Sequence, residues 1–210
     1  MGRNGMYLSK SRYIRGLQCY KSLWLLEHRP ELASPPDEST QTVLKNGYEV
    51  GDLACELFPG GKMIPTDASL GEQISLTKEA MASADVIYEA AFSHGNVFIR
   101  ADILQKKNAG WELYEVKSAA GMKNEYYDDV AVQCHVLDSA GIPISKACLV
   151  HIDSSYMRSG PLDLQQLFKI VDLTEEARVR QSEVIESLAR MRSMLEGDEP
   201  ARVHHTEAYF

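Results

Sequence analysis

The sequence predicts an α/β fold in which a mixed central sheet of four or five strands is flanked by helices. Three short runs within residues 86–117 are rich in β-branched and aromatic residues and are separated by turn residues, which is typical of an antiparallel meander. Apolar residues at helical spacing precede and follow this region. Two further apolar runs come after the helix that follows the third strand. The chain of 210 residues, 44% of them hydrophobic, is long enough to bury one core.

Each element can be justified in chain order. A first helix is expected at 6–27, capped by Ser9 or Ser11. A second helix, 40–57, ends at Phe58-Pro59-Gly60-Gly61. The remaining expected elements are a helix at 70–83, strands at 86–92, 97–104 and 111–117, a helix at 124–140, strands at 146–152 and 167–173, and a helix at 174–195 with Thr174 as its cap.

We expect one compact domain made of four consecutive parts. These are an N-terminal helical segment (1–61), an α/β core (62–173), a C-terminal helix (174–196) and a flexible polar tail (197–210).

Composition narrows the class of protein. No apolar run reaches the length of a membrane span, and no secretory signal is visible. We therefore expect a cytoplasmic protein that does not associate with a membrane. The four cysteines form no CxxC pair, which favours reduced thiols. The net charge of −8 disfavours a protein that coats duplex DNA.

The charge is nevertheless uneven. Residues 1–29 hold six basic residues and one acidic residue. Lys10, Arg12 and Arg15 on the first helix can therefore form a face that follows a phosphate backbone. An ordinary solvated helix face is the equal alternative.

The stretch from Asp102 to Lys117 carries the chemistry. If residues 107–110 form a four-residue hairpin loop, Lys106 pairs with Trp111 and Asp102 lies opposite Glu115. Lys117, two residues beyond Glu115, shares that face. Two close carboxylates repel unless a cation offsets them, and Mg²⁺ or Mn²⁺ prefers such oxygen ligands. A lysine beside them suits hydrolysis of a phosphodiester.

The same spacing has an ordinary explanation. Glu115 and Lys117 could form a solvated strand face with a surface salt bridge worth at most about 1 kcal/mol. The apolar neighbours Ile99, Ile103, Leu113 and Val116 favour the functional interpretation, because they place the charges in a hydrophobic setting. Glu89 is expected to pair with Arg100 across the first hairpin.

Several motifs together resemble the PD-(D/E)xK nuclease superfamily, in its RecB-like and Cas4-like branch, and more narrowly the bacterial family called domain of unknown function 2779. The resemblance covers about residues 6–175. It is carried by Arg100-Ala101-Asp102-Ile103-Leu104, Trp111-Glu112-Leu113-Tyr114-Glu115-Val116-Lys117-Ser118, Leu8-Ser9-Lys10-Ser11-Arg12-Tyr13, Gly16-Leu17-Gln18-Cys19, Lys21-Ser22-Leu23-Trp24-Leu25, Gly47-Tyr48-Glu49-Val50-Gly51, Phe58-Pro59-Gly60-Gly61 and Asp128-Asp129-Val130-Ala131-Val132-Gln133.

The resemblance implies a restriction-endonuclease-like core and assigns roles to residues of this chain. Asp102, Glu115 and the carbonyl of Val116 would be metal ligands, and Lys117 the catalytic lysine. Gln133 would hold the lysine or contact DNA, with a solvent-facing helix residue as the alternative. Glu49, on the early helix, would lend a further acid to the metal.

The chain also departs from the family pattern. The early helix has no histidine, and no cysteine follows residue 148, so the late cysteines of an iron–sulfur cluster are missing and no cluster is expected. Cys19 matches the early cysteine position, and its alternative is a small buried side chain. A tyrosine after Gln133 is absent.

The predicted function is therefore an Mg²⁺- or Mn²⁺-dependent deoxyribonuclease that acts on DNA ends or single strands, either as a monomer or as a homo-oligomer. Tyr126, which follows the active strand, could stack on a base or pack in the core. The first alternative is a catalytically weak or inactive nuclease-fold module that binds DNA or a protein partner. The second is a metal-dependent phosphohydrolase acting on nucleotides.

Overall fold

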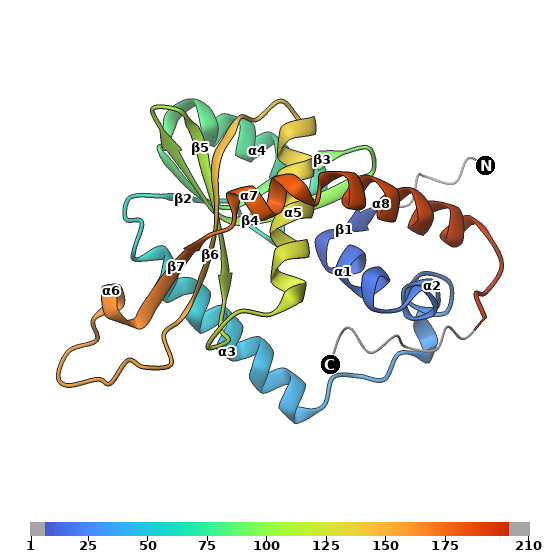
Figure 1. The fold of residues 1–210 in the computed structure, drawn as a ribbon, viewed down its shortest axis with the longest axis horizontal. Helices are drawn as coiled ribbons and strands as arrows, with labels where there is room; N and C mark the ends of the chain where they lie inside the picture. The colour runs from blue at the N-terminus through green and yellow to red at the C-terminus, as the bar shows by residue number, and fades with distance from the viewer. Residues whose placement is uncertain (1–6, 202–210) are drawn as a thin grey trace.

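The computed structural model describes residues 7–201 of the chain, and within them seven strands form one mixed sheet. The strand order is β2-β3-β4-β5-β6-β7, and β1 pairs with β4 outside this path (Figure 1). The strands are β1 (Leu8–Ser9), β2 (Lys62–Met63), β3 (Val86–His94), β4 (Val97–Lys107), β5 (Gly110–Lys117), β6 (Ile144–Ile152) and β7 (Phe168–Asp172).

Helices cover the sheet on both faces. They are α1 (Lys10–Gln18), α2 (Tyr20–His28), the short 3₁₀ helix η1 (Pro30–Leu32), α3 (Glu38–Cys55), α4 (Leu70–Ser83), α5 (Asn124–Ser139), α6 (Leu164–Leu167), α7 (Thr174–Val179) and α8 (Gln181–Glu196). Figure 1 shows α3 running diagonally away from the sheet, with α1, α2 and α8 gathered on the opposite side of the view. No helix within residues 7–201 is long and apolar enough to cross a membrane.

The predicted α/β class with a mixed sheet is confirmed. Strands β3, β4 and β5 form the expected antiparallel meander, β5 and β6 run parallel, and β6 and β7 run antiparallel. The sheet is larger than expected because β1 and β2 add to it, each pairing in parallel with one neighbour. Both are only two residues long, too short for an alternating pattern to reveal.

Alternation along the strands separates the core into two parts. Leu104 and Leu113 pack with α5 on one face of the sheet. Ile103 and Tyr114 belong to the other cluster, which includes Ala54 near the end of α3. The ends of β4 and β5 thus lie between α5 and α3.

The predicted first helix was wrong in one respect, since it is two helices that break at Cys19. Cys19 is extended, with φ −162° and ψ 111°, and its Sγ accepts a hydrogen bond from the Ser22 N–H at 3.4 Å, which caps α2. Ser9, one of the two serines expected to cap this helix, caps α1 by accepting a hydrogen bond from the Arg12 N–H. Residue 6 lies outside the described residues.

The C-terminal helix also differs from the expectation, because it is divided at Arg180 into α7 and α8. Thr174 is not its cap. Its hydroxyl instead accepts the Ala147 N–H at 3.0 Å and donates to Asp172, which ties the start of α7 to the sheet. The predicted tail, 197–210, falls mostly outside the described residues.

The hairpin between β4 and β5 is tighter than predicted. Lys106 pairs with Trp111 as expected, but Lys107 also pairs with Gly110, which leaves a loop of two residues. Gly110 adopts φ 132°, a conformation that favours glycine. The register is as expected from Ile103 to Lys107, but the pairing ends at Ile103 and Tyr114, where the strands separate, so Asp102 and Glu115 are not paired across the strands as predicted.

Candidate active site

The site lies at a fork in the sheet. One edge of β4 pairs with β3 over its length, while the other edge pairs with β5 from Ile103 to Lys107 and with β1 at Val97 and Phe98. Between these two partners β4 has no neighbouring strand, so β5 and β1 leave a gap beside Asp102. The gap lies where β5 ends and where α1 begins directly after β1.

Asp102 bridges the fork. It is the residue just beyond the last β4–β5 pair, Ile103 with Tyr114. Its Oδ2 accepts a hydrogen bond from the Val116 N–H at 2.7 Å, so the carboxylate joins the two strands where their backbones separate. The same count along β3 and β4 places Glu89 opposite Asp102, between the pairs Tyr88–Ile103 and Ala90–Ala101.

Glu115 is buried, with 2% of its side chain exposed, and its two carboxylate oxygens are surrounded by donors. Lys10 Nζ lies 2.8 Å from both oxygens, and Lys117 Nζ lies 2.7 Å from Oε1. Gln133 donates to Oε2 at 2.8 Å. The burial of this carboxylate is therefore offset by two ammonium groups and one amide.

Helix α5 supplies the far wall of the cluster. Asp129 and Gln133 are four residues apart, so they lie on one face of the helix and meet the end of β5. Lys117 bonds to Asp129, and Lys10 lies 3.5 Å from Asp129 Oδ1. Gln133 is fully buried, and no partner among the described residues binds its Oε1.

The three carboxylates of the cluster, of which Glu115 and Asp129 are buried and Asp102 is partly buried, differ in their electrostatics. Burial and the nearby Glu115 raise the pKa of Asp102 to about 7, against the opposing effect of Lys10. Burial also raises the pKa of Asp129. For Glu115 the effect of burial is outweighed by Lys10 and Lys117, which hold its pKa far below the usual range.

Both lysines carry a proton at neutral pH. Burial acts to lower the pKa of Lys117, but Glu115 and Asp129 raise it well above the ordinary value. The pKa of Lys10 is likewise raised, with burial opposing and Asp129 and Glu115 favouring the charged form. In this arrangement Lys117 is a positive charge and not a proton acceptor.

The cluster forms the floor of a cleft of about 560 Å³. The opposite wall comes from α3 and is largely apolar. Its exposed side chains include Tyr48 at 75%, Val43 at 64% and Leu44 at 53% exposure. A charged floor thus faces an apolar wall, as in a site for a ligand with a charged and a flat apolar part.

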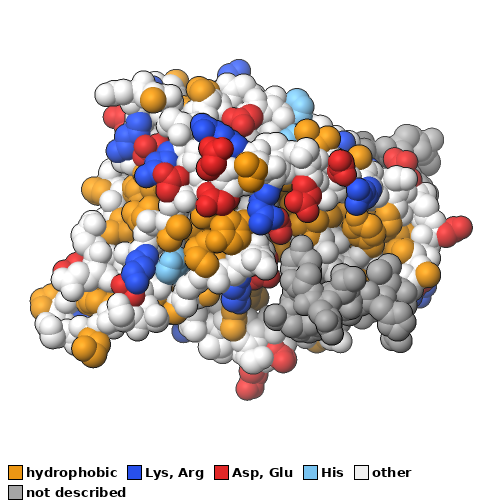
Figure 2. Space-filling view, viewed as in Figure 1, with side chains coloured by type: hydrophobic (Ala, Val, Ile, Leu, Met, Phe, Trp, Pro, Cys, Tyr) orange, Lys and Arg blue, Asp and Glu red, His pale blue; other side chains and the backbone are white. Residues whose placement is uncertain are grey.

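A second hollow of about 470 Å³ lies beside α1 and shares Lys10 and Lys117 with the cleft. Arg15 is exposed and lines it. Arg12 also borders it but is engaged, since its guanidinium bonds to Glu27 at 2.7 Å and to the Tyr7 carbonyl at 3.0 Å. On the face shown in Figure 2, acidic and basic side chains are intermixed, with hydrophobic side chains exposed between them.

The structure brings together most of the predicted site residues. Asp102, Glu115, Val116 and Lys117 line the cleft, and Gln133 bonds to Glu115 from α5. Lys10, expected on a DNA-binding face, lies within the carboxylate cluster instead. Glu89 forms the expected ion pair with Arg100, at 3.9 Å, and also lines the cleft.

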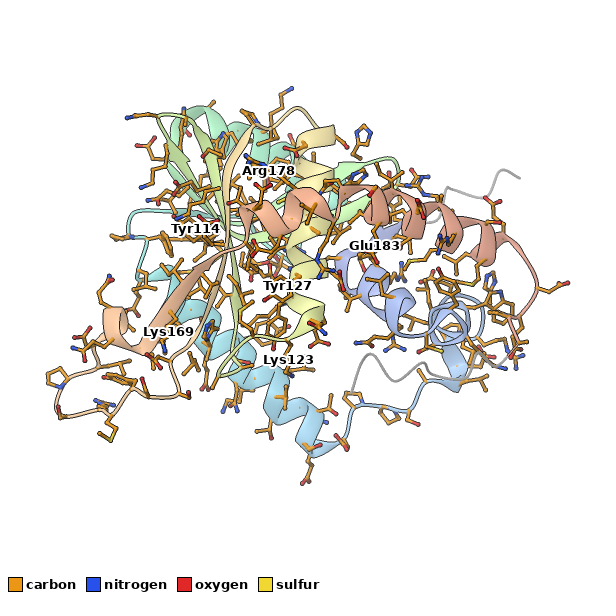
Figure 3. The ribbon with its side chains drawn as sticks, viewed as in Figure 1. Tyr114, Lys123, Tyr127, Lys169, Arg178 and Glu183 are labelled. Atoms are coloured by element: carbon orange, nitrogen blue, oxygen red, sulfur yellow. The ribbon has the colours of Figure 1, made fainter. Side chains whose placement is uncertain are left out.

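Two predicted residues are placed elsewhere. Glu49 is not brought to the cluster, because it lies on the exposed side of α3 and pairs with Lys45 at 3.7 Å. Tyr126 is buried, at 6% exposure, and its ring lies 5.4 Å below the Lys117 ammonium, so it packs against the lysine and is not free to stack on a base. Figure 3 shows the neighbouring Tyr127 and Lys123 on the same end of α5.

Sequence reasoning missed Asp129 and Asp52 as members of the site. Asp129 could have been found, because it lies four residues before Gln133 and therefore on the same helix face. Asp52 lines the cleft from α3, three residues after the expected Glu49. The contact of Lys10 with Glu115 spans 105 residues and has no local signal.

The donor set fits a hard divalent cation in its chemistry. Asp102 and Glu115 offer carboxylate oxygens on adjacent strands, and the buried Gln133 Oε1 lacks a partner within the described residues. Among residues 7–201 no group of three or more histidine, cysteine, aspartate or glutamate side chains has the spacing of a formed metal site. The oxygens of Glu115 are instead occupied by ammonium and amide groups.

Comparisons with known proteins add little to this geometry. No family model matches the chain, and no curated protein matches it. Among solved structures, LHK-Exo in complex with dAMP is similar over 90% of both chains, with 12% identity and a TM-score of 0.48. The alkaline exonuclease LHK-Exo from Laribacter hongkongensis, again over 90% of both chains, has 14% identity and a TM-score of 0.45.

A third solved structure, SSO0001, is similar over 89% of this chain and 78% of its own, with 13% identity and a TM-score of 0.33. Likenesses at these values carry no conclusion about activity, so the function must be judged from the residues of the cleft.

Proposed function

We propose that this chain is a divalent-metal-dependent deoxyribonuclease that hydrolyses phosphodiester bonds at DNA ends or in single strands. The observation that carries the proposal is the fork between β4 and β5, where Asp102 and Glu115 meet Lys117 in an open cleft. The resemblance of these strands to the PD-(D/E)xK nucleases, in the RecB-like and Cas4-like branch, supports the same assignment.

Asp102, Glu115 and the Val116 carbonyl would hold the cation. When bound, Mg²⁺ or Mn²⁺ neutralises the carboxylates, polarises the phosphate and lowers the pKa of a bound water. The chain's own part is to keep Asp102 fixed through the Val116 N–H and to keep Glu115 ionised through its two lysines.

Lys117 has the electrostatic role in this scheme. Because its pKa is raised by Glu115 and Asp129, its ammonium can stabilise negative charge that develops on the attacked phosphate. Gln133 and Asp129 are positioning residues, since they hold Glu115 and Lys117 in place from α5. Arg15, in the hollow beside α1, can contact the adjoining phosphates.

The apolar wall of the cleft supports a substrate with unpaired bases. A base inside a duplex is stacked and paired, whereas an end or a single strand can present its flat face to an aromatic ring. Tyr48, with Val43 and Leu44 beside it, provides such a surface on the same cleft as the carboxylates. This favours ends and single strands over the interior of a duplex.

One observation favours the alternative of a binding module that does not cut. Glu115 is fully satisfied by Lys10, Lys117 and Gln133 without any metal, so the cluster is stable as it stands. The same fold could then hold DNA or a protein partner through the cleft. The third candidate is a phosphohydrolase of free nucleotides, which would be recognised because it acts on nucleotides and not on polymers.

Purified protein incubated in Mn²⁺ with labelled single-stranded and duplex DNA tests the proposal. We expect degradation, with single strands or ends preferred, and a loss of at least about a hundredfold in Asp102→Asn and Lys117→Met. Glu112→Gln on the same strand and Lys146→Met on β6 are matched controls, since both lie outside the cleft and should keep activity.

The alternatives give different results in the same assay. Retention of DNA without cleavage would identify the binding module, and release of phosphate from nucleotides but not from polymers would identify the phosphohydrolase. Degradation that survives undiminished in Asp102→Asn and Lys117→Met would not depend on the proposed site and would overturn the assignment.

A further inference from the structure

Lys10 holds Glu115 in the way that a bound cation would. Its Nζ is 2.8 Å from both carboxylate oxygens and 3.5 Å from Asp129 Oδ1, so a single positive charge is shared by two buried acids from β5 and α5. Lys10 is the first residue of α1, which directly follows the two-residue strand β1.

Lys10 also lies where three hollows meet. It borders the cleft of about 560 Å³, the hollow of about 470 Å³ beside α1, and a smaller one of about 200 Å³ between α1 and the Glu89–Arg100 pair. Its side chain therefore has open space on several sides, with 21% of its surface exposed. A change in its position would join spaces that it now separates.

A divalent cation and Lys10 compete for the same oxygens. Lys10 and Lys117 already place two positive charges on Glu115, so a divalent cation beside both would be repelled strongly, because the interior screens charges far less than water does. Lys117 is the less movable of the two lysines, since it contacts Glu115, Asp129 and the Tyr126 ring and extends from a central strand. Lys10 has one close carboxylate partner and is anchored at a helix start.

We propose that Lys10 is a tethered cation that occupies Glu115 when no metal is bound and is exchanged for the divalent cation. The exchange opens the cleft to the hollow beside α1 and frees the ammonium for a substrate phosphate. This inference rests on the proposed metal dependence. The exchange makes one prediction that metal dependence alone does not make. Removal of the positive charge at Lys10 should strengthen metal binding.

Calorimetric titration with Mn²⁺ tests the exchange on the wild type, Lys10→Met, Lys10→Gln and Lys45→Met. Lys45 is a matched control, since it is 77% exposed on α3 and pairs with the exposed Glu49. We expect Lys10→Met and Lys10→Gln to bind Mn²⁺ about tenfold or more tightly, within the range usual for coupled sites, and Lys45→Met to change affinity less than about twofold. In EDTA both Lys10 variants should melt at a lower temperature than the wild type.

A second measurement needs no substitution. Acylation of lysines in the wild-type protein, followed by peptide mass spectrometry, reports whether each ammonium is bonded or free. Saturating Mg²⁺ should speed the labelling of Lys10 at least about fivefold and leave that of Lys45 unchanged.

The outcomes separate this inference from the proposed function. If the wild type binds Mn²⁺ and the Lys10 variants bind equally or more weakly, or if Mg²⁺ leaves Lys10 labelling unchanged, the exchange is wrong while the metal site stands. If the Lys10 variants bind and the wild type does not, Lys10 blocks the site as proposed. If neither binds, both the exchange and the metal-dependent function are overturned.

Discussion

Asp102 and Glu115 belong to one cluster, but their different neighbours shift the pKa values of the two carboxylates in opposite directions. Glu115 has two lysines and an amide on its oxygens, and its pKa is held low. Asp102 has the Val116 N–H as its close donor, and burial raises its pKa to about 7. A cation that arrives at this site therefore meets one acid already charged and a second that titrates near neutral pH.

The raised pKa of Asp102 makes a prediction about stability. The folded protein retains this proton to about pH 7, while the unfolded chain releases it near the ordinary value of 3.8. Between these limits the folded state binds more protons, so the contribution of Asp102 to the free energy of unfolding falls as pH rises. In Asp102→Asn this loss is absent.

The stability gained by Asp102→Asn over the wild type should thus grow between about pH 5 and about pH 8, by more than the roughly 1.4 kcal/mol that corresponds to one pKa unit. Urea unfolding in EDTA at the two pH values measures it. Asp153→Asn is the control without pH dependence in this window, because Ser155 and Lys169 lower the pKa of Asp153 to about 2, so its contribution to stability is lost only below about pH 4 and should be equal at both pH values. A gain for Asp102→Asn that shrinks with pH would contradict the assignment.

At the scale of elements, α3 and α1 use glycine for different reasons. A Cβ at Gly47 of α3 would meet no atom within 4 Å, whereas a Cβ at Gly16 of α1 would lie 2.6 Å from Met191 Sδ and 2.9 Å from Leu23 Cδ2. Met191 and Leu23 are fully buried, so they have little room to move. Gly16 therefore serves the packing of α1 against α8, and Gly47 has no such packing role.

Alanine substitutions at the two glycines should move stability in different directions. Gly47→Ala is expected to stabilise the protein by about 0.5 to 1 kcal/mol, because glycine costs entropy inside a helix. Gly16→Ala gains the same entropy but forces atoms into the core, which typically costs about 1 to 3 kcal/mol. Chemical denaturation should place Gly16→Ala at least about 1 kcal/mol below Gly47→Ala, and the reverse order would show that α1 packs otherwise.

At the scale of the whole molecule, the sequence predicted what is local and missed what is distant. The hairpin register, which is paired as far as Ile103 and Tyr114, brings the next residues Asp102 and Glu115 near each other, and the period of two puts Lys117 on the face of Glu115, so this part of the site was predictable. Helix and strand order followed from the same short-range patterns. The break at Cys19 was not predictable, because a thiol is an uncommon helix cap.

The remainder of the site depends on contacts that only the folded chain defines. Lys10 reaches Glu115 because β1, only two residues long, pairs with β4 beside the fork. Glu49 and Asp52 lie on one helix less than a turn apart, and only the packing of α3 decides that Asp52 faces the cleft. Helices α1, α3 and α5, which are far apart in the sequence, thus contribute to one site at the end of β5.

Anomalous scattering from a crystal soaked in Mn²⁺ would test the proposed cation site most directly. We predict one strong peak in contact with carboxylate oxygens of both Asp102 and Glu115 on the floor of the cleft. A soaked crystal with Mn²⁺ bound only elsewhere, or with no peak beside these two residues at saturating concentration, would contradict it.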